Sequence, residues 1–136
     1  MFSNVLSPYC IKMSWKELVI TLVTLLALDA CFIGITKDIW YLQVASVQRV
    51  SMQPRILGAI VSYLCMTIGL WYFILRDRRS VWEAMLLGMV TIGVFDSTNY
   101  TIFKKWKWQM AVMDTLWGGA LFAITTMVVY WFSASR

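Results

Sequence analysis

The uncharged stretch from Ile56 to Leu75 constrains the fold of this chain more than any other feature. It contains 20 consecutive residues, and none of them carries a charged side chain. About 20 mainly apolar residues are what an α-helix needs to cross the hydrocarbon core of a bilayer. The stretch therefore predicts a membrane-spanning helix.

Three further apolar runs have the length of spans, at about residues 18–36, 81–103 and 108–132. Hydrophobic residues make up 60% of the chain, against roughly 45–50% in soluble proteins. A soluble fold of this size could not bury that much apolar surface, so lipid must surround it. We expect an all-α, multi-pass integral membrane protein, a four-helix bundle formed by residues 15–136 after an N-terminal tail of residues 1–14.

The segment between the first two spans, residues 37–55, mixes apolar and polar side chains. Trp40, Val44, Val47 and Val50 recur at close to helical spacing. A tryptophan such as Trp40 is suited to the depth of the lipid headgroups. The segment therefore predicts a short interfacial helix between spans one and two.

Polar residues also mark the other connections. Ser80 and Glu83 form the pattern Ser-x-x-Glu, which is typical of a capping box that opens a helix. Basic residues gather at positions 76–79 and 104–107 as flanking anchors rather than in one stripe, so the net charge of +5 does not indicate a nucleic-acid partner. Six basic residues fall on each side of the membrane, and their count favours neither orientation.

The chain has no histidine and three cysteines. The cysteines show no CxxC spacing, so neither a disulfide framework nor a zinc site is indicated. We predict no cofactor.

Carboxylates inside the apolar runs point to a functional site. Asp29 lies in the first run, Asp96 in the third and Asp114 in the fourth. A carboxylate at the centre of a membrane helix costs about 2.5–3.5 kcal/mol on insertion scales. No basic side chain lies inside the spans to neutralise these groups. Crowded carboxylates repel one another, and protonation or a bound cation would relieve the repulsion.

The three aspartates are expected at one depth. Asp29 is eight residues before Lys37, and Asp96 and Asp114 lie seven or eight residues from the lysines that end their spans. At 1.5 Å per residue, each carboxylate is then roughly 10–12 Å from the same membrane face.

Neighbouring residues extend this candidate site. Asn99 and Trp117 each follow one of the aspartates by three residues and so share its helix face, while two threonines are hydroxyl donors. The ligand- or ion-binding candidates are Asp29, Asp96, Asn99, Asp114, Trp117, Thr98 and Thr115. The three aspartates are the ligands to expect if the chain holds a metal, although we assign no metal centre.

Small residues recur along the fourth span, where they form a narrow face. Such a face lets helices approach closely, within the bundle or in a homo-oligomer. The helix-packing candidates are Ala111, Gly118, Gly119 and Ala123. Polar residues such as Asn99 have a plainer interpretation too, because interhelical hydrogen bonds join membrane helices at about 0.6 kcal/mol each.

Three motifs carry a family resemblance: Leu28-Asp29 followed by Phe32 and Gly34, then Phe95-Asp96-Ser97-Thr98-Asn99 followed by Lys104 and Trp106, and finally Asp114-Thr115-Leu116-Trp117-Gly118. With them the chain, from about Ser14 to its end, resembles a family of small four-span predicted membrane proteins catalogued as domain of unknown function 2177. The resemblance implies a membrane location. Phe32 stands where members of that family usually carry Trp, and Lys105 where Gly is usual.

Three functions are compatible with these features. The first is a membrane protein that binds or moves a cation, a proton or a small polar solute at the acidic site. The second is a structural or assembly protein without transport, which would use its small-residue face. The third is a membrane-embedded lipid-modifying enzyme that holds Mg²⁺ through its carboxylates. The third is favoured least, because the spans contain no Lys or Arg that could bind a phosphate.

Overall fold

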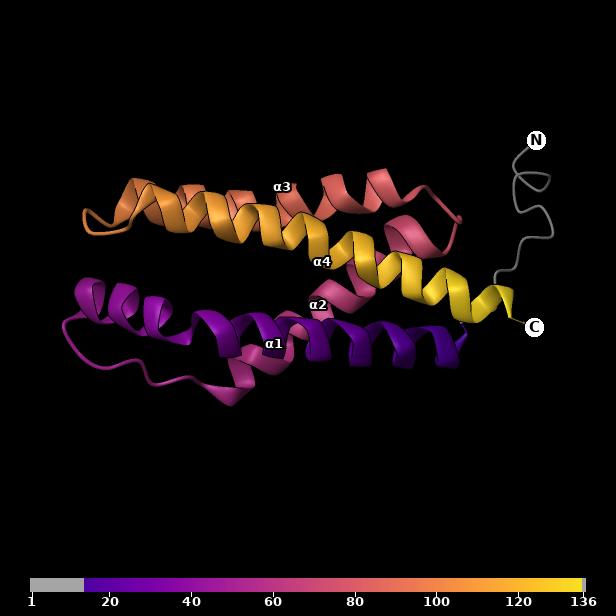
Figure 1. The fold of residues 1–136 in the computed structure, drawn as a ribbon, viewed down its shortest axis with the longest axis horizontal. Coiled ribbons are helices and arrows are strands. Elements are labelled where there is room, and N and C mark those ends of the chain that lie inside the picture. The colour runs from indigo at the N-terminus through magenta and orange to yellow at the C-terminus, as the bar shows by residue number, and fades with distance from the viewer. Residues whose placement is uncertain (1–13, 136) are drawn as a thin grey trace, which may run out of the picture.

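The computed structural model of the protein describes residues 14–135 (Figure 1). Its elements are α1 (Trp15–Gln48), α2 (Ile56–Leu70), a π-helical turn η1 (Trp71–Leu75), α3 (Val81–Ile102) and α4 (Trp108–Ala134). No strand occurs among the described residues, and the predicted all-α bundle is confirmed. The expected N-terminal tail, residues 1–14, lies outside them apart from Ser14.

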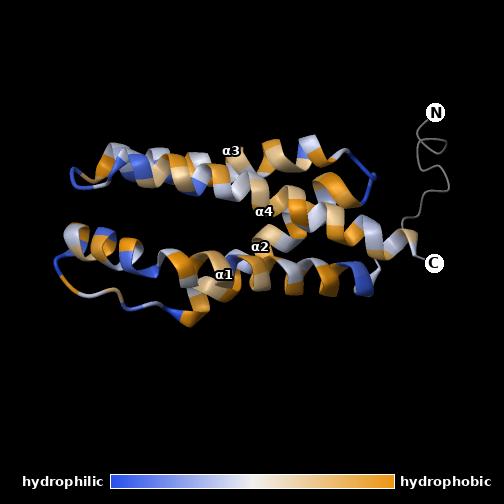
Figure 2. Cartoon of the chain, in the orientation of Figure 1, coloured by the Kyte–Doolittle hydropathy of each residue, from blue (hydrophilic) through white to orange (hydrophobic). Residues whose placement is uncertain are grey.

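All four helices, with η1 continuing α2, are long and apolar enough to cross a membrane. Large apolar side chains are exposed on each of them, for example Leu57, Trp82 and Leu116. Figure 2 shows the hydrophobic colour along the helices and the hydrophilic colour concentrated in the connections between them. Lipid is the solvent that such a surface requires. The chain is therefore an integral, multi-pass membrane protein.

Local sequence determines where α3 begins. The Ser80 backbone N–H donates to Glu83 Oε2 at 2.9 Å, and the Glu83 N–H donates to Ser80 Oγ at 3.3 Å. This is the predicted capping box, which satisfies two backbone donors that the first helical turn would otherwise leave unpaired.

The helices run up and down, so the chain has two ends that each gather several connections (Figure 1). At one end, Glu17 Oε1 accepts hydrogen bonds from Arg78 Nη2 at 2.5 Å and from Ser133 Oγ at 3.0 Å. These bonds join α1, the α2–α3 turn and α4. We call this the Glu17 end. At the other end, Gln43 Nε2 of α1 donates to the Lys105 carbonyl oxygen at 2.9 Å. We call this the Lys105 end.

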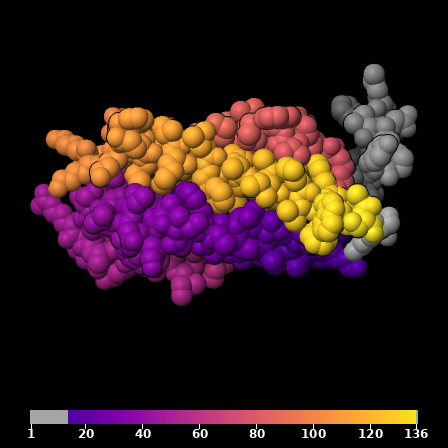
Figure 3. Space-filling model, in the orientation of Figure 1, coloured from indigo at the N-terminus to yellow at the C-terminus, as the bar shows by residue number. Residues whose placement is uncertain are grey.

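The closest helix pair is α3 with α4, and glycines make this approach possible. A Cβ placed on Gly88 would overlap the carbonyl oxygen of Gly118, and one on Gly119 would lie 2.5 Å from the Met89 side chain. Gly118 and Gly119 are buried, whereas Ala111 and Ala123 are half-buried. Small residues thus bring the two backbones together, as the sequence predicts. Figure 3 shows α1 lying against α4 along the face in view.

The separate interfacial helix expected between spans one and two does not form. Residues 37–48 instead continue α1, which ends where Arg49 adopts a left-handed conformation at φ 60°. No Gly or Pro interrupts the sequence from Lys37 to Gln48, so nothing stops the helix there. The contact of Gln43 with Lys105 then holds this extension against the α3–α4 turn.

Candidate functional site

Asp29 joins three helices through its two carboxylate oxygens. Tyr63 Oη of α2 donates to Asp29 Oδ2 at 2.5 Å, and Trp117 Nε1 of α4 donates to Asp29 Oδ1 at 3.0 Å. The Trp117 ring is further fixed by Phe32, which stacks on it with a centroid separation of 4.6 Å and an interplanar angle of 7°. Phe32 therefore keeps an aromatic contact at this position without a ring N–H.

Asp96 is buried between α3 and α4 in a different way. Its exposed fraction is 0%, and neither of its carboxylate oxygens has a hydrogen-bond partner. Because α3 and α4 are antiparallel and Gly93 lies against Thr115, Asp96 comes beside Asp114, and the two carboxyl groups face each other.

Two more buried polar atoms lie without partners on the Lys105 side of this pair. They are Trp106 Nε1, which points toward Asp96, and Gln43 Oε1. Buried polar groups in native proteins are nearly always satisfied by protein or by ordered water. These orphaned atoms thus place two unsatisfied polar groups between the Lys105 end and Asp96, in a part of the molecule that also contains the Trp40 ring, 6.3 Å from that of Trp106.

A cavity of about 200 Å³ connects the two acidic groups. Asp29, Asp114 and Trp117 line it, together with Phe32, Trp40 and the apolar side chains Met66, Ile92 and Leu121. Among the described residues, no basic side chain lines it. Among residues 14–135 the ion pairs are Arg76–Asp77, Arg78–Glu17 and Arg79–Glu83, so none of the three aspartates is neutralised by a Lys or Arg.

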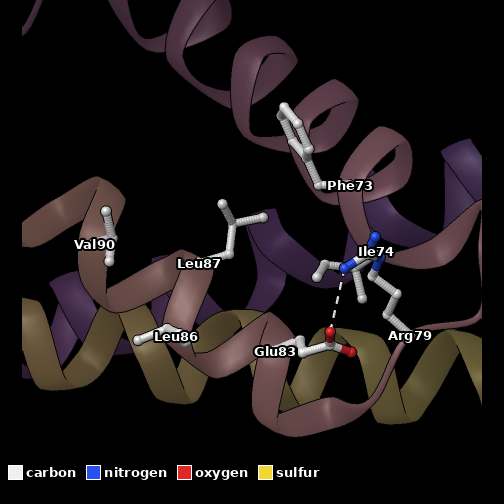
Figure 4. Close-up of a pocket in the computed structure, with 7 residues that line it drawn as sticks. All are labelled: Phe73, Ile74, Arg79, Glu83, Leu86, Leu87 and Val90. Atoms are coloured by element: carbon white, nitrogen blue, oxygen red, sulfur yellow. Dashed lines mark hydrogen bonds and ion pairs between the residues drawn. The ribbon is translucent and has the colours of Figure 1, made fainter.

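A larger hollow of about 390 Å³ lies near the Glu17 end, and it does not contain the predicted residues. Figure 4 shows Arg79 and Glu83 paired at one side of it, with Phe73, Leu87 and Val90 among its apolar lining. The two charged groups already pair at 3.2 Å. The remaining surface is open and apolar, as expected where lipid covers a helix. The smaller cavity is therefore the better candidate site.

Comparison with known proteins places this chain in a family. The profile of the family described as "Predicted membrane protein (DUF2177)" matches residues 14–131. The chain belongs to this family. No curated protein and no solved structure matches it.

The DUF2177 protein brings only part of the predicted site together. Asp29, Asp114 and Trp117 meet at the cavity, and Asp96 lies behind Asp114. Thr98 is exposed and donates to the Val94 carbonyl oxygen of its own helix at 2.7 Å. Thr115 packs against Gly93, and Asn99 is half-buried one turn along from Asp96.

The aspartates also do not share one depth. The prediction took Lys37 as the end of the first span, but Gln43 is the residue level with Lys105. Asp29 lies 14 residues before Gln43, or about 21 Å along α1. Asp96 lies only six residues, or about 9 Å, before the last residue of α3. Measured along its helix, Asp29 therefore lies farther from the Lys105 end than Asp96 does.

The metal-ligand prediction gains no support from this geometry. Within the part of the chain that the structure describes, no group of three or more acidic, cysteine or histidine side chains is placed to hold a metal ion. The carboxylates instead form one facing pair and one hydrogen-bonded group.

Sequence reasoning missed Tyr63, Gln43 and Trp106 as members of the site. Tyr63 lies in the uncharged span, where no charge pattern marks it. A signal was present nonetheless, because a tyrosine hydroxyl inside an apolar helix needs a partner and Asp29 is an acceptor. Gln43 belongs to the segment for which the sequence predicts a separate interfacial helix, because the first span is expected to end near residue 36.

Proposed function

We propose that this protein reversibly binds a proton at the Asp96–Asp114 carboxyl pair inside the membrane. One observation carries the proposal. The Asp96 carboxyl is fully buried, has no hydrogen-bond partner, and faces a second carboxyl with no basic side chain beside it. A single shared proton gives this pair a donor and removes one negative charge.

The electrostatic argument is direct. Two unit charges 4 Å apart repel by about 4 kcal/mol at an effective dielectric constant of 20, and the repulsion grows as the surroundings become drier. Facing carboxyl groups therefore hold a proton in common and release it when the pH rises or when another positive charge arrives. The orphaned Gln43 and Trp106 atoms support a hydrated route for that proton from the Lys105 end.

A proton suits the donor set better than a divalent metal ion. Calcium takes about six to eight oxygen ligands, and magnesium demands near-octahedral geometry. The pair offers two carboxyl groups whose surroundings are largely apolar, and no third acidic group joins them among residues 14–135. A proton needs only the pair itself.

Infrared difference spectroscopy across a pH titration tests the proposal. The purified protein in lipid should show a protonated-carboxyl band that is lost or shifted in Asp96→Asn and in Asp114→Asn. Asp38→Asn is the matched control, because Asp38 is an exposed residue of α1. An unchanged titrating band in both site variants would overturn the proposal.

Proteoliposomes that enclose a pH-sensitive dye extend the test to movement. Flux that falls to the level of empty vesicles in Asp96→Asn, and not in Asp38→Asn, would support proton movement. Equal fluxes in all three proteins would count against movement.

The alternative functions have weaker support. An assembly role was suggested by the small-residue face, but Gly118 and Gly119 already pack against α3 within one chain. A lipid-modifying enzyme would need basic groups for a phosphate, and none lines the cavity.

A further inference from the structure

The cavity, which residues of α1, α2, α3 and α4 line, has room only for a small ligand. Its volume is about 200 Å³, whereas pockets for drug-sized ligands measure roughly 300–1,000 Å³. At about 30 Å³ per water molecule, the space corresponds to a compact solute of a few non-hydrogen atoms. Metabolites with long chains or several rings are too large for it.

Its charge selects a cation. Asp29 and Asp114 both line the space, and Asp96 adds a third carboxyl directly behind Asp114. No Lys or Arg is among the lining residues. An anion would meet repulsion here, and a neutral solute would leave the negative charge uncompensated.

Its walls select an organic cation over a metal ion. Phe32, Trp40 and Trp117 contribute aromatic rings, and most of the remaining lining is aliphatic or a methionine side chain. A metal ion entering this space would lose its hydration shell against apolar surface. An ammonium group carrying methyl or methylene substituents gains from that surface and from the faces of aromatic rings.

The recognition groups are already held in position. Tyr63 and Trp117 fix the Asp29 carboxylate, which retains acceptor capacity because each oxygen has a second lone pair. The stack with Phe32 and the hydrogen bond to Asp29 together hold the Trp117 ring. Binding therefore requires little ordering of side chains.

We propose that this cavity binds a small organic ammonium ion, with Asp29 and Asp114 as counter-ions and the aromatic rings as its walls. The inference rests on the proposed function, because the arriving cation takes the place of the proton held by the Asp96–Asp114 pair. One positive charge enters as one proton leaves, so the charge of the site is unchanged.

Calorimetric titration of the protein in lipid nanodiscs with tetramethylammonium chloride tests this inference. We expect saturable binding with release of a proton. Binding should be absent for tert-butanol, which is similar in shape but neutral, for sodium chloride, and for tetrabutylammonium, which is too large for the cavity. No saturable binding of tetramethylammonium, or equal binding of sodium, would overturn the proposal.

Variants assign the binding to this cavity. Asp29→Asn should weaken tetramethylammonium binding at least about ten-fold, since it removes one counter-ion from a desolvated site. Trp117→Phe keeps an aromatic ring and should weaken it less, which covers the case in which Asp29→Asn fails to fold. Asp38→Asn should bind as the parent protein does. Parent-like binding in both site variants would place the ammonium ion elsewhere and overturn the proposal.

The two proposals can fail separately. If the infrared band of the Asp96–Asp114 pair titrates as expected while tetramethylammonium does not bind, only the ammonium site is refuted. If the infrared band of the pair is absent as well, both the ammonium site and the proton site are refuted.

Discussion

At the scale of single residues, two of the aspartates are buried at very different cost. Both oxygens of Asp29 accept a hydrogen bond, from Tyr63 and Trp117. Asp96 is completely buried, and both of its oxygens lack a partner. An unsatisfied buried polar group costs roughly 1–3 kcal/mol, and more when it is charged. Asp29 therefore contributes to holding the helices together, whereas Asp96 lowers the stability of the fold, as residues of functional sites often do.

At a pH high enough to remove the shared proton, Asp96→Asn should accordingly stabilise the protein by about 1 kcal/mol, because the amide removes a carboxylate repulsion and can donate to Asp114. Thermal unfolding in detergent measures this, with Asp38→Asn as a control that should change nothing. A clear loss of stability in Asp96→Asn would mean that this carboxyl has a structural role.

Trp117→Phe should act in the opposite direction. It keeps the aromatic stack with Phe32 but leaves Asp29 Oδ1 without its donor, which should cost roughly 1–3 kcal/mol of unfolding free energy. Trp82→Phe is the matched control, since the Trp82 side chain is 73% exposed. Equal unfolding curves for the two variants would show that the indole N–H contributes nothing at Asp29.

The sequence identifies those site residues whose burial in a membrane helix is energetically unfavourable, because the sequence of that helix alone shows them. Asp29, Asp96 and Asp114 stand out because each interrupts an apolar run. Thr98 is two residues from Asp96, and residues at that spacing do not share a helix face; its hydroxyl donates to the Val94 carbonyl oxygen instead. Tyr63 was missed because its contact with Asp29 joins α2 to α1. The sequence of a single helix does not show how that helix is aligned against its neighbour.

At the scale of elements, helix limits follow the strength of the local signals. The capping box fixes the start of α3 at Val81, and α4 starts at Trp108 as predicted. The ends at Ile102 and Ala134 lie within two residues of the predicted 103 and 132. The first helix departs most, because Lys37 and Asp38 look like a boundary but do not break a helix. No helix breaker stops it before Gln48, and Gln43 holds the extension through its hydrogen bond to the Lys105 carbonyl oxygen, 62 positions away in sequence.

The α3–α4 contact provides the prediction for this scale. Gly88→Ala should destabilise the protein by about 3 kcal/mol, since its Cβ would overlap the Gly118 backbone and force the helices apart. Gly34→Ala is the control, because a Cβ there meets nothing within 4 Å and alanine has the higher helix propensity, by up to about 1 kcal/mol. If the two variants unfold alike, this close approach does not occur.

At the scale of the whole molecule, the polar groups are distributed unevenly along the bundle. The Glu17 end is held by ion pairs and by the apolar cluster that includes Leu25, Leu70 and Phe122. The cavity, the acidic pair and the unpartnered atoms of Gln43 and Trp106 lie between that cluster and the Lys105 end, whereas Thr125 Oγ1 is unpartnered within the cluster itself. Most of the buried polar atoms without a partner among residues 14–135 therefore lie in the half of the bundle that ends at Lys105.

Membrane topology follows from the same arrangement and can be tested by labelling cysteines. In a variant whose three native cysteines are replaced, Asp77→Cys and Lys104→Cys put a thiol into exposed turns at opposite ends of the bundle. A membrane-impermeant maleimide should label the two from opposite sides of sealed vesicles, because α3 crosses the membrane between them. The maleimide should label Gln53→Cys from the same side as Lys104→Cys, since the α1–α2 and α3–α4 connections lie at the same end of the bundle (Figure 1). Labelling of positions 77 and 104 from one side would contradict the four-span arrangement and, with it, a site buried inside the membrane.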